Sequence, residues 1–573
     1  MDYDLKITGG TIVDGTGADR YDGDVGIKDG VVVALGDAPG AAAQEIDATG
    51  KIVSPGFVDA HTHYDAQILW DRMLTISPWH GVTTVVLGNC GFGVAPTRPE
   101  HRETIMRTLE KVEGMSMDAL EAGLGRDWPF ESFPEYMDAV EKQGAAINVG
   151  VLLGHTPLRM YVMGDDSTER EATSAEIESM REIVGEALDA GALGFATSKS
   201  PTHVGAKGKP VPSRASNFED EIMPLARVLG EKEQGLIQVT IGSDVLQDEF
   251  AQMARETGRN VTWTALLTGL SLGGKNHDEQ IAKAHELRDE GLGVYPQVTP
   301  RALNFEMHFA EPFLYESMSM FRPVSQADNE GKKEIYRDPD FREAFKKKLQ
   351  PGSSFLVASG WPKTVISFYP PDPSLEERLI WDVAAERGVD PLDLMLDMSL
   401  ETDLKARFRT PVANHNEDHV EPLLKDDCTV LGLSDAGAHA SQLCDACFAT
   451  YMLGHWVREK GALTLEYAVK RLTSQAADVF GITDRGRLAV GVPADVVVFD
   501  ADTVGAQGLE RVHDLPGGAD RLISKADGIE AVVVNGTLLR QGDKDMLSAS
   551  DTLPGRLLRG GRAADSAEQA AAE

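Results

Sequence analysis

The stretch PGFVDAHTHYDA, residues 55–66, places two histidines one residue apart directly after a short apolar strand. Side chains alternate between the two faces of a strand, so His61 and His63 point to the same side. Two imidazoles on one face at the end of a strand can bind one metal ion. Two hydrogen-bonded surface histidines would give the same pattern. The Pro-Gly turn before the strand and the motifs downstream favour the metal site.

The middle of the chain alternates short apolar runs with helical stretches, which is typical of βα units around a parallel sheet. The eight candidate strands cover residues 56–63, 82–90, 145–155, 192–198, 236–240, 260–268, 292–299 and 428–435. Eight parallel strands with crossovers predict a (β/α)8 barrel of the TIM type. In such a barrel the chemistry lies at the carboxyl ends of the strands.

Both ends of the chain contain short alternating strands and Gly-rich turns, which predict one small β-sandwich domain built from the two termini. The predicted domains are residues 1–55 and 481–561 for the β-sandwich, 56–480 for the barrel, and 562–573 for a disordered tail. Within the barrel domain we expect insertions near residues 100–144 and 302–350. The second insertion is rich in aromatic residues and methionine at its start.

The composition restricts the partners of this chain. It has 573 residues, of which 42% are hydrophobic, and a net charge of −36, which argues against binding to nucleic acid or anionic membrane surfaces. No apolar stretch approaches the ~20 residues that a membrane helix needs. The N-terminus lacks the pattern of a signal peptide. We therefore expect a cytoplasmic protein with a small-molecule substrate, and a homo-oligomer is compatible with the sequence.

Two further residues with metal-binding side chains end predicted strands. Cys90, in GVTTVVLGNCGFG, can ligate as a thiolate, and Asp435, in VLGLSDAGAH, can ligate and accept a proton from water. Taken singly, Cys90 would more often be a core thiol, and Asp435 would more often be a turn residue. Together with His61 and His63 they would face one mouth of the barrel. This set predicts a metal site made by all four residues.

Other polar residues near the strand ends are candidates for contact with a substrate. His155, in GHTPLR, ends the third strand and is expected to steady the substrate or an oxyanion, although a histidine bonded to loop backbone fits the pattern equally well. Lys199 and His203, in SKSPTH, follow the fourth strand, and His439 follows Asp435 by four residues. The sequence leaves the roles of these three residues open.

These residues lie in motifs that resemble the amidohydrolase superfamily and, within it, the N-acyl-D-amino-acid deacylase (D-aminoacylase) family. The matching motifs are PGFVDAHTH, GVTTVVLGNCGFGVAP, GHTPLR, GALGFATS, LGLSDAG and LTLEYAVKRLTSQAADVFGITDRGRLAVGVPADVVVFD. The resemblance spans nearly the whole chain. It implies zinc-dependent hydrolysis of the amide of N-acylated D-amino acids. It also implies that His61, His63 and Cys90 ligate metal and that Asp435 is both a ligand and the general base.

The chain departs from the family pattern at several positions. The metal-binding histidines that the family carries after strands five and six are replaced by Ile241 and Ala265, and a family lysine is replaced by Leu267. A family arginine after the last-strand aspartate has no counterpart. We therefore expect one zinc ion rather than two. We also expect a substrate that is neutral or bulkier than one with a free amino-acid carboxylate.

The leading function is a metal-dependent hydrolase of an amide C–N bond, similar to N-acyl amino acid deacylases, with Asp435 as the general base. One alternative is a hydrolase of a cyclic amide, imide or lactone, because a fold does not settle the substrate. A second alternative is a catalytically silent amidohydrolase-fold protein that binds a ligand or serves in an assembly. The missing histidines favour the silent protein, whereas the retention of four candidate ligands argues against it.

Overall fold

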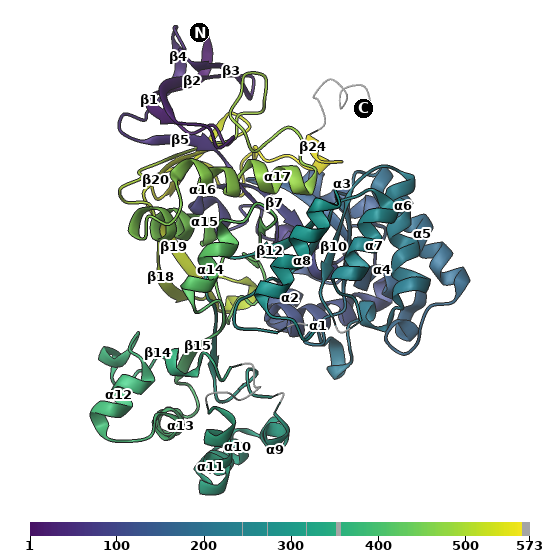
Figure 1. Cartoon of the computed structure of the whole chain (residues 1–573), viewed down its shortest axis with the longest axis vertical. Coiled ribbons are helices and arrows are strands. Elements are labelled where there is room, and N and C mark those ends of the chain that lie inside the picture. Colours follow the sequence, from purple (N-terminus) through teal and green to yellow (C-terminus); the bar gives the residue numbers. More distant parts are fainter. Residues whose placement is uncertain (243, 272, 317, 351–356, 564–573) are drawn as a thin grey trace.

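Eight parallel strands form a sheet at the centre of the molecule, as the computed structural model shows (Figure 1). The structure describes residues 1–242, 244–271, 273–316, 318–350 and 357–563. The order of the strands is β16-β12-β11-β10-β9-β8-β7-β6. Their bounds are β6 Phe57–Asp59, β7 Val82–Leu87, β8 Asn148–Gly154, β9 Gly194–Ser198, β10 Leu236–Thr240, β11 Val261–Thr264, β12 Val294–Val298 and β16 Val430–Leu431. Each strand lies within one of the eight ranges expected from the sequence.

The two ends of this sheet meet and close it into a barrel. Thr62, after β6, forms a parallel bridge with Ala436, after β16. The His63 amide donates to the Ala436 carbonyl at 2.7 Å, and the Ser434 hydroxyl donates to the His61 carbonyl at 2.9 Å. The predicted barrel fold is therefore confirmed. The same contacts bring the first histidine motif beside the segment that carries Asp435.

Helices connect the barrel strands and cover their outer side (Figure 1). The helices are α1 Arg102–Glu113, α2 Met117–Leu124, α3 Phe133–Gln143, α4 His155–Met163, α5 Ser174–Asp189, α6 Met223–Glu231, α7 Gln247–Thr257, α8 His277–Asp289, α14 Glu417–Leu424, α15 Phe448–Tyr451, α16 Leu465–Leu472 and α17 Ser474–Phe480. Capping residues in the sequence determine where several of these helices begin. In α5, Thr173 and Glu176 form a reciprocal capping box that satisfies free amides of the first turn. Strands β7 and β8 are buried along their whole length, because side chains pack on both faces.

Strands from both chain termini share one nine-stranded sheet, drawn above the barrel in Figure 1. Its strands are β1 Tyr3–Ile12, β2 Tyr21–Lys28, β3 Val31–Gly36, β4 Ala42–Asp47, β5 Ile52–Pro55, β17 Val496–Phe499, β20 Ile529–Val534, β21 Thr537–Gln541 and β22 Lys544–Asp545. The junction between the two halves is the antiparallel pair β5–β17. Apolar residues from both halves form a separate hydrophobic core. The small domain built from both termini is thus present, and its exact bounds stay a prediction.

The second expected insertion is the first part of a larger unit, which lies below the barrel in Figure 1. Its elements are β13 Leu303–His308, α9 Arg322–Gln326, α10 Asn329–Arg337, α11 Pro339–Lys348, β14 Val365–Phe368, α12 Ile380–Arg387, α13 Pro391–Glu401 and β15 Arg407–Ala413. The unit extends past residue 350 because β15 returns to pair with both β13 and β14. It has its own hydrophobic core, which includes Phe309, Tyr336 and Phe408.

A hairpin from the C-terminal region contacts the barrel. Its strands are β18 Gly505–Val512 and β19 Arg521–Asp527, and a short pair, β23 Leu558–Arg559 and β24 Arg562–Ala563, follows. The Leu522 amide donates to the Ala440 carbonyl at 2.8 Å, in the loop after Asp435.

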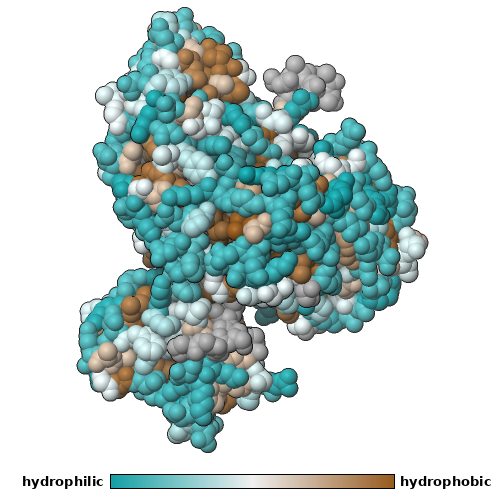
Figure 2. All heavy atoms as spheres, in the orientation of Figure 1, coloured by the Kyte–Doolittle hydropathy of each residue, from teal (hydrophilic) through white to brown (hydrophobic). Residues whose placement is uncertain are grey.

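Hydrophilic residues cover most of the face shown in Figure 2, in keeping with the charge of −36. Of the tail expected at 562–573, residues 564–573 lie outside the described residues.

Candidate metal centre

The two histidines of the PGFVDAHTH motif meet Cys90 in the mouth of the barrel. One ligand atom from each of His61, His63 and Cys90 lies within 4.8 Å of the other two, and all three residues are buried. His61 Nε2 and Cys90 Sγ are 3.4 Å apart. Two imidazole nitrogens and a sulfur are ligands that zinc prefers. The ends of β6 and β7 therefore present a donor set that suits a divalent ion of this type.

Asp435 reaches the same cluster from the loop after β16. Its Oδ1 atom lies 3.3 Å from His61 Nε2 and 3.8 Å from His63 Nε2. The backbone at Asp435 has a φ of 46°, in the left-handed region that Asp and Asn tolerate better than most residues. Burial raises the pKa of this carboxyl, whose side chain is 15% exposed. Of the four residues that the sequence offered as metal ligands, the structure thus groups His61, His63 and Cys90 within 4.8 Å and places Asp435 beside the two histidines.

A buried glutamine determines which nitrogen of His61 faces the cluster. Oε1 of Gln297, on β12, lies 2.6 Å from His61 Nδ1. A glutamine Oε1 atom accepts hydrogen bonds, so the neutral ring carries its hydrogen on Nδ1 and leaves the Nε2 lone pair for a metal. Gly432 makes room for this contact, because a Cβ there would lie 2.4 Å from Gln297 Oε1.

Cys90 is held by its own backbone. Its φ is 56°, and its amide donates to Gln238 Oε1, on β10, at 2.7 Å. The glycine that follows is required, because a Cβ at Gly91 would lie 2.8 Å from the Thr197 Cα. Burial and the charge of Asp435 raise the pKa of the Cys90 thiol. This thiol therefore gives up its proton readily only when a cation lies beside it.

Glu113, at the end of α1, is a residue of this centre that the sequence did not reveal. Its Oε1 lies 3.3 Å from His63 Nδ1, and neither atom has a hydrogen bond among the described residues. Burial raises the pKa of the Glu113 carboxyl well above its usual range. A carboxylate behind a ligating histidine orients the ring in many metal sites. Only the folded structure brings the end of α1 beside His63, since Glu113 is far from the PGFVDAHTH motif in the sequence.

A family model confirms the class of this chain. The model described as the amidohydrolase family matches residues 44–331 and 372–539. The chain belongs to the amidohydrolase family. Its relatives include a D-aminoacylase and deacylases of N-acyl-D-glutamate and N-acyl-D-aspartate, so, as expected from the sequence, this amidohydrolase is a metal-dependent enzyme that hydrolyses amide C–N bonds other than peptide bonds.

Individual relatives agree with the predicted D-aminoacylase-like family. This amidohydrolase is 30% identical to an N-acyl-D-glutamate deacylase of Alcaligenes xylosoxydans xylosoxydans, over 93% of each chain. It resembles a solved D-aminoacylase with a binuclear metal centre, described by one-metal activation and second-metal attenuation (TM-score 0.66, 26% identity, 97% of this chain and 100% of that one). It also resembles N-acyl-D-glutamate deacylase of Bordetella bronchiseptica, solved with zinc and a phosphonate inhibitor (TM-score 0.63, 27% identity, 98% and 100%).

Two strand ends of this amidohydrolase present apolar residues instead of ligands. Ile241 follows β10 and is buried, and Ala265 follows β11. Further along the β11 loop, Leu267 packs with Ala413 and Leu433 in a small apolar cluster. Isoleucine and alanine side chains carry no atom that can ligate a metal. The mouth of the barrel therefore has its donors on the β6, β7 and β16 side.

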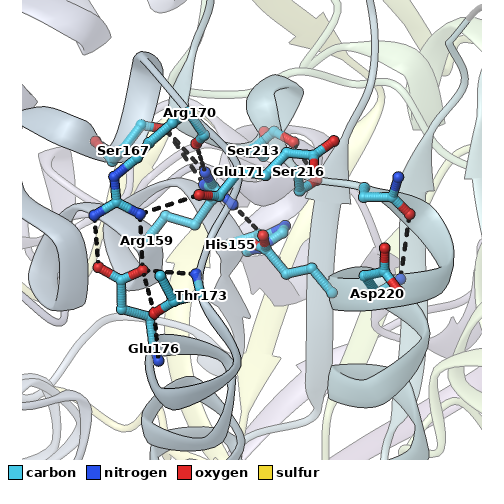
Figure 3. A network of polar contacts seen from close by, with 12 residues as sticks. His155, Arg159, Ser167, Arg170, Glu171, Thr173, Glu176, Ser213, Ser216 and Asp220 are labelled. Carbon is cyan, nitrogen blue, oxygen red and sulfur yellow. Dashed lines mark hydrogen bonds and ion pairs between the residues drawn. The ribbon is translucent and has the colours of Figure 1, made fainter.

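The contacts of His155 favour a supporting role over contact with a substrate. Figure 3 shows the polar network around His155 and Arg159. The His155 ring lies 2.8 Å from Thr197 Oγ1 through Nδ1 and 2.8 Å from Glu221 Oε1 through Nε2, and the residue is fully buried. Arg159 donates to the other Glu221 oxygen. Both ring nitrogens have partners, so the structure places His155 as a support of the loop after β8.

The remaining candidates divide between loop structure and the mouth of the barrel. Lys199 Nζ donates to two backbone carbonyls and pairs with Asp244 at 3.0 Å, so its charge serves the loop after β9. His439 is half-buried, and its ring lies 5.4 Å from that of Phe305. The ring of His203 lies 4.9 Å from that of Phe92, which in turn lies 6.4 Å from that of His63. Among the described residues, no helix is long and apolar enough to span a membrane.

Proposed function

We propose that this amidohydrolase binds one zinc ion through His61, His63, Cys90 and Asp435 and hydrolyses the amide of an N-acylated amino acid or a related acyl amide. The supporting observation is that one atom, His61 Nε2, lies 3.4 Å from Cys90 Sγ and 3.3 Å from Asp435 Oδ1. The bound metal would activate a water molecule and polarise the substrate carbonyl.

The protein supplies the proton chemistry through Asp435. Its carboxylate accepts a proton from the attacking water and then donates it to the nitrogen of the leaving amine. Burial, which raises the pKa of Asp435, makes this carboxyl a better proton acceptor than an exposed aspartate. Gln297 and Glu113 keep the two imidazoles in position, so the reacting groups need little rearrangement.

A single ion is proposed because the other side of the mouth lacks donors. Ile241 and Ala265 replace the two histidines expected there. Metal analysis of purified, zinc-equilibrated protein tests this directly. We expect about one zinc ion per chain and complete loss of tight binding in a His61→Ala, His63→Ala double variant. Two tightly bound ions per chain would contradict the single-ion proposal.

An apolar wall formed by the loops after β11 and β16 supports an acyl amide with a hydrophobic part. Leu267 and Leu433 are each 9% exposed and pack with Ala265, Leu270 and Leu303. Apolar groups of a substrate gain free energy by covering such a surface.

The wall is held rigid by Asn414, at the end of the unit inserted after β12. Asn414 Oδ1 accepts the Thr268 amide at 2.7 Å, and the Asn414 amide donates back to the Thr268 carbonyl at 3.0 Å. A third contact runs from Asn414 Nδ2 to the Thr299 carbonyl at 3.2 Å. The inserted unit therefore fixes the loop after β11 and shapes the mouth of the barrel.

A substrate panel distinguishes the acyl amide from the alternative of a cyclic amide, imide or lactone. The zinc-loaded enzyme is assayed with N-acetyl-D- and N-acetyl-L-amino acids, a hydantoin, a dihydropyrimidine and a lactone. We expect the highest kcat/KM for an N-acetyl amino acid with an apolar side chain. Preference for a ring substrate would favour the alternative. A cytoplasmic location and a homo-oligomeric state remain predictions from the sequence.

A further inference from the structure

The loop after β9, residues 199–217, is tied by side-chain hydrogen bonds to the carboxyl end of its strand around Arg214. Lys199 Nζ donates to the carbonyls of Arg214 and Ser216 at 3.1 and 2.7 Å. The Ser213 hydroxyl donates to the Ser198 carbonyl, the last residue of β9, at 2.9 Å. Because β9 ends at the carboxyl face of the barrel, these bonds fix the backbone of Arg214 on the face that carries the metal centre.

His203 connects this loop to the ligand cluster. Its Nδ1 lies 2.7 Å from Ser198 Oγ, and its ring lies 4.9 Å from the ring of Phe92. The Phe92 ring in turn lies 6.4 Å from that of His63. Burial, together with the neighbouring charges of His439, Arg214 and His61, lowers the pKa of His203 to about 3. His203 is therefore neutral near pH 7 and sits between Arg214 and the metal ligands.

The guanidinium of Arg214 is left with unused donors. Its Nη1 donates to the His203 carbonyl at 3.1 Å. Among the described residues, no carboxylate lies within ion-pair distance of it, although the chain has 91 acidic and 55 basic residues. The side chain is partly buried. A guanidinium has five N–H donors in a planar fork that matches a carboxylate, and partial burial strengthens such a pair.

We propose that Arg214 binds the carboxylate of the substrate and is the main specificity residue for an acidic acyl amide. The proposal rests on the function proposed above. The scissile amide lies at His61, His63 and Asp435, the anionic group reaches toward β9, and the apolar part lies against Leu267.

This assignment reverses one expectation from the sequence. Loss of the family lysine at Leu267 and of the family arginine after Asp435 suggested a neutral substrate. The structure offers a cation from a different strand end instead, because the β9 loop folds back over its own strand. With Arg214 on the β9 side and an apolar wall on the β11 side, the proposed substrate carries a carboxylate at one end and a hydrophobic group at the other.

Binding and turnover of a matched pair of compounds test the role of Arg214. N-acetyl-D- and N-acetyl-L-forms of methionine, leucine and phenylalanine are compared with their carboxamides, which lack the negative charge. Binding is measured by calorimetry on zinc-loaded Asp435→Asn protein, with and without Arg214→Met. We expect Arg214→Met to weaken binding of the best acid about 10²-fold, as loss of a charged hydrogen bond does. Binding of its carboxamide should change less than about threefold.

Matched variants separate recognition from folding. Arg214→Lys keeps the charge without the fork and should recover about tenfold of the loss. Arg259→Met removes an arginine that also donates only to backbone carbonyls, between α7 and β11, and should leave acid binding unchanged. If Arg214→Met does not fold, as judged by its thermal unfolding, Arg214→Lys carries the test and must weaken acid binding selectively.

Three results would overturn the assignment. The first is that the protein with intact Arg214 binds the acid and its carboxamide equally well. The second is that the Arg214 variants weaken binding of both compounds equally. The third is that no acid in the set binds in a way that depends on Arg214. A failure of the proposed function looks different. In that case acids bind through Arg214, yet the zinc-loaded enzyme with Asp435 intact hydrolyses none of them.

Discussion

Oε1 of Gln297 lies 2.6 Å from Nδ1 of His61, so one ring nitrogen is engaged by β12 while the other faces Cys90 and Asp435. This contact sets the tautomer of a proposed ligand from β12, which is separated from β6 by β16 alone in the closed barrel. It also explains a glycine at position 432, since any Cβ there would occupy the space of the glutamine side chain. This contact would support a bound metal, and nothing in the PGFVDAHTH motif itself indicates that it exists.

Gln297→Leu should weaken zinc binding about 10- to 100-fold, because the ring of His61 loses the acceptor that fixes its tautomer and orientation. Leucine has a similar size, so the barrel interior stays filled. Competition with a zinc chelator measures the dissociation constant. Gln234→Leu is the control, because Gln234 bonds to the Leu188 carbonyl away from the site. Unchanged zinc affinity in Gln297→Leu would show that the contact is incidental.

Asp435→Asn should lower kcat by about 10³-fold with little change in the free energy of unfolding, because it removes the proton acceptor. Asparagine tolerates the positive φ of this position, so the backbone is expected to keep its conformation. Steady-state kinetics on zinc-loaded protein and urea unfolding check both parts. Asp543→Asn, in an exposed turn, is the matched control. Substantial remaining turnover in Asp435→Asn would remove this residue from the role of base.

Zinc affinity should rise with pH by about tenfold per unit between about pH 6.5 and 8.5. The reason is that Cys90, whose thiol pKa is raised by burial and by Asp435, must lose its proton to ligate. His61, whose pKa burial lowers to about 4, is already neutral in this range and adds no slope. Chelator competition at several pH values gives the dependence. Cys90→Ser should bind more weakly and with a flatter profile, and an unchanged profile would argue against a thiolate ligand.

His80 should make the protein sensitive to mild acid. Burial lowers the pKa of His80 to about 4, and its ring bonds to Thr450 Oγ1 at 2.7 Å and to the Ser524 carbonyl at 2.9 Å. The unfolded chain takes up this proton near pH 6.5 and the folded chain only near pH 4, so stability falls as the pH drops through that window.

His80→Gln isolates this contribution, because glutamine can still donate to Ser524 and does not titrate. Between about pH 7 and 4.5 the unfolding free energy of the natural protein should fall by about 2 kcal/mol more than that of the variant. Urea titrations at both pH values measure the difference. Parallel losses in the two proteins would mean that other groups cause the acid sensitivity.

Much of the fold was predictable because its signals are local. The eight strand ranges rest on short apolar runs, and all eight contain a strand of the barrel. The second insertion was expected to end near residue 350, but the unit extends to Ala413 at the end of β15. That error arose because β15 pairs with β13 across about a hundred residues, and no local pattern records such a pairing.

The candidate site, like the fold, combines features that the sequence predicted with features that it did not. His61, His63, Cys90 and Asp435 were identified from motifs at strand ends, where side-chain chemistry and position coincide. The sequence left two roles open for His155, since a histidine beside a strand end has no signal that tells whether Glu221 and Thr197 occupy its nitrogens. Glu113 and Arg214 were missed, because an acid at a helix end and an arginine in a loop are ordinary in sequence.

The sequence by itself determined the barrel, the joining of the two termini in one sheet, and the candidate ligands at the ends of β6, β7 and β16. These features follow from hydrophobic periodicity and residue type, which act over a few residues at a time. Only the tertiary structure decided which nitrogen of His61 is free, which carboxyl group lies beside His63, and which arginine is the candidate for binding a substrate carboxylate. Those relationships depend on side chains from distant strands and helices meeting in one buried volume, where distance and low polarity fix their roles.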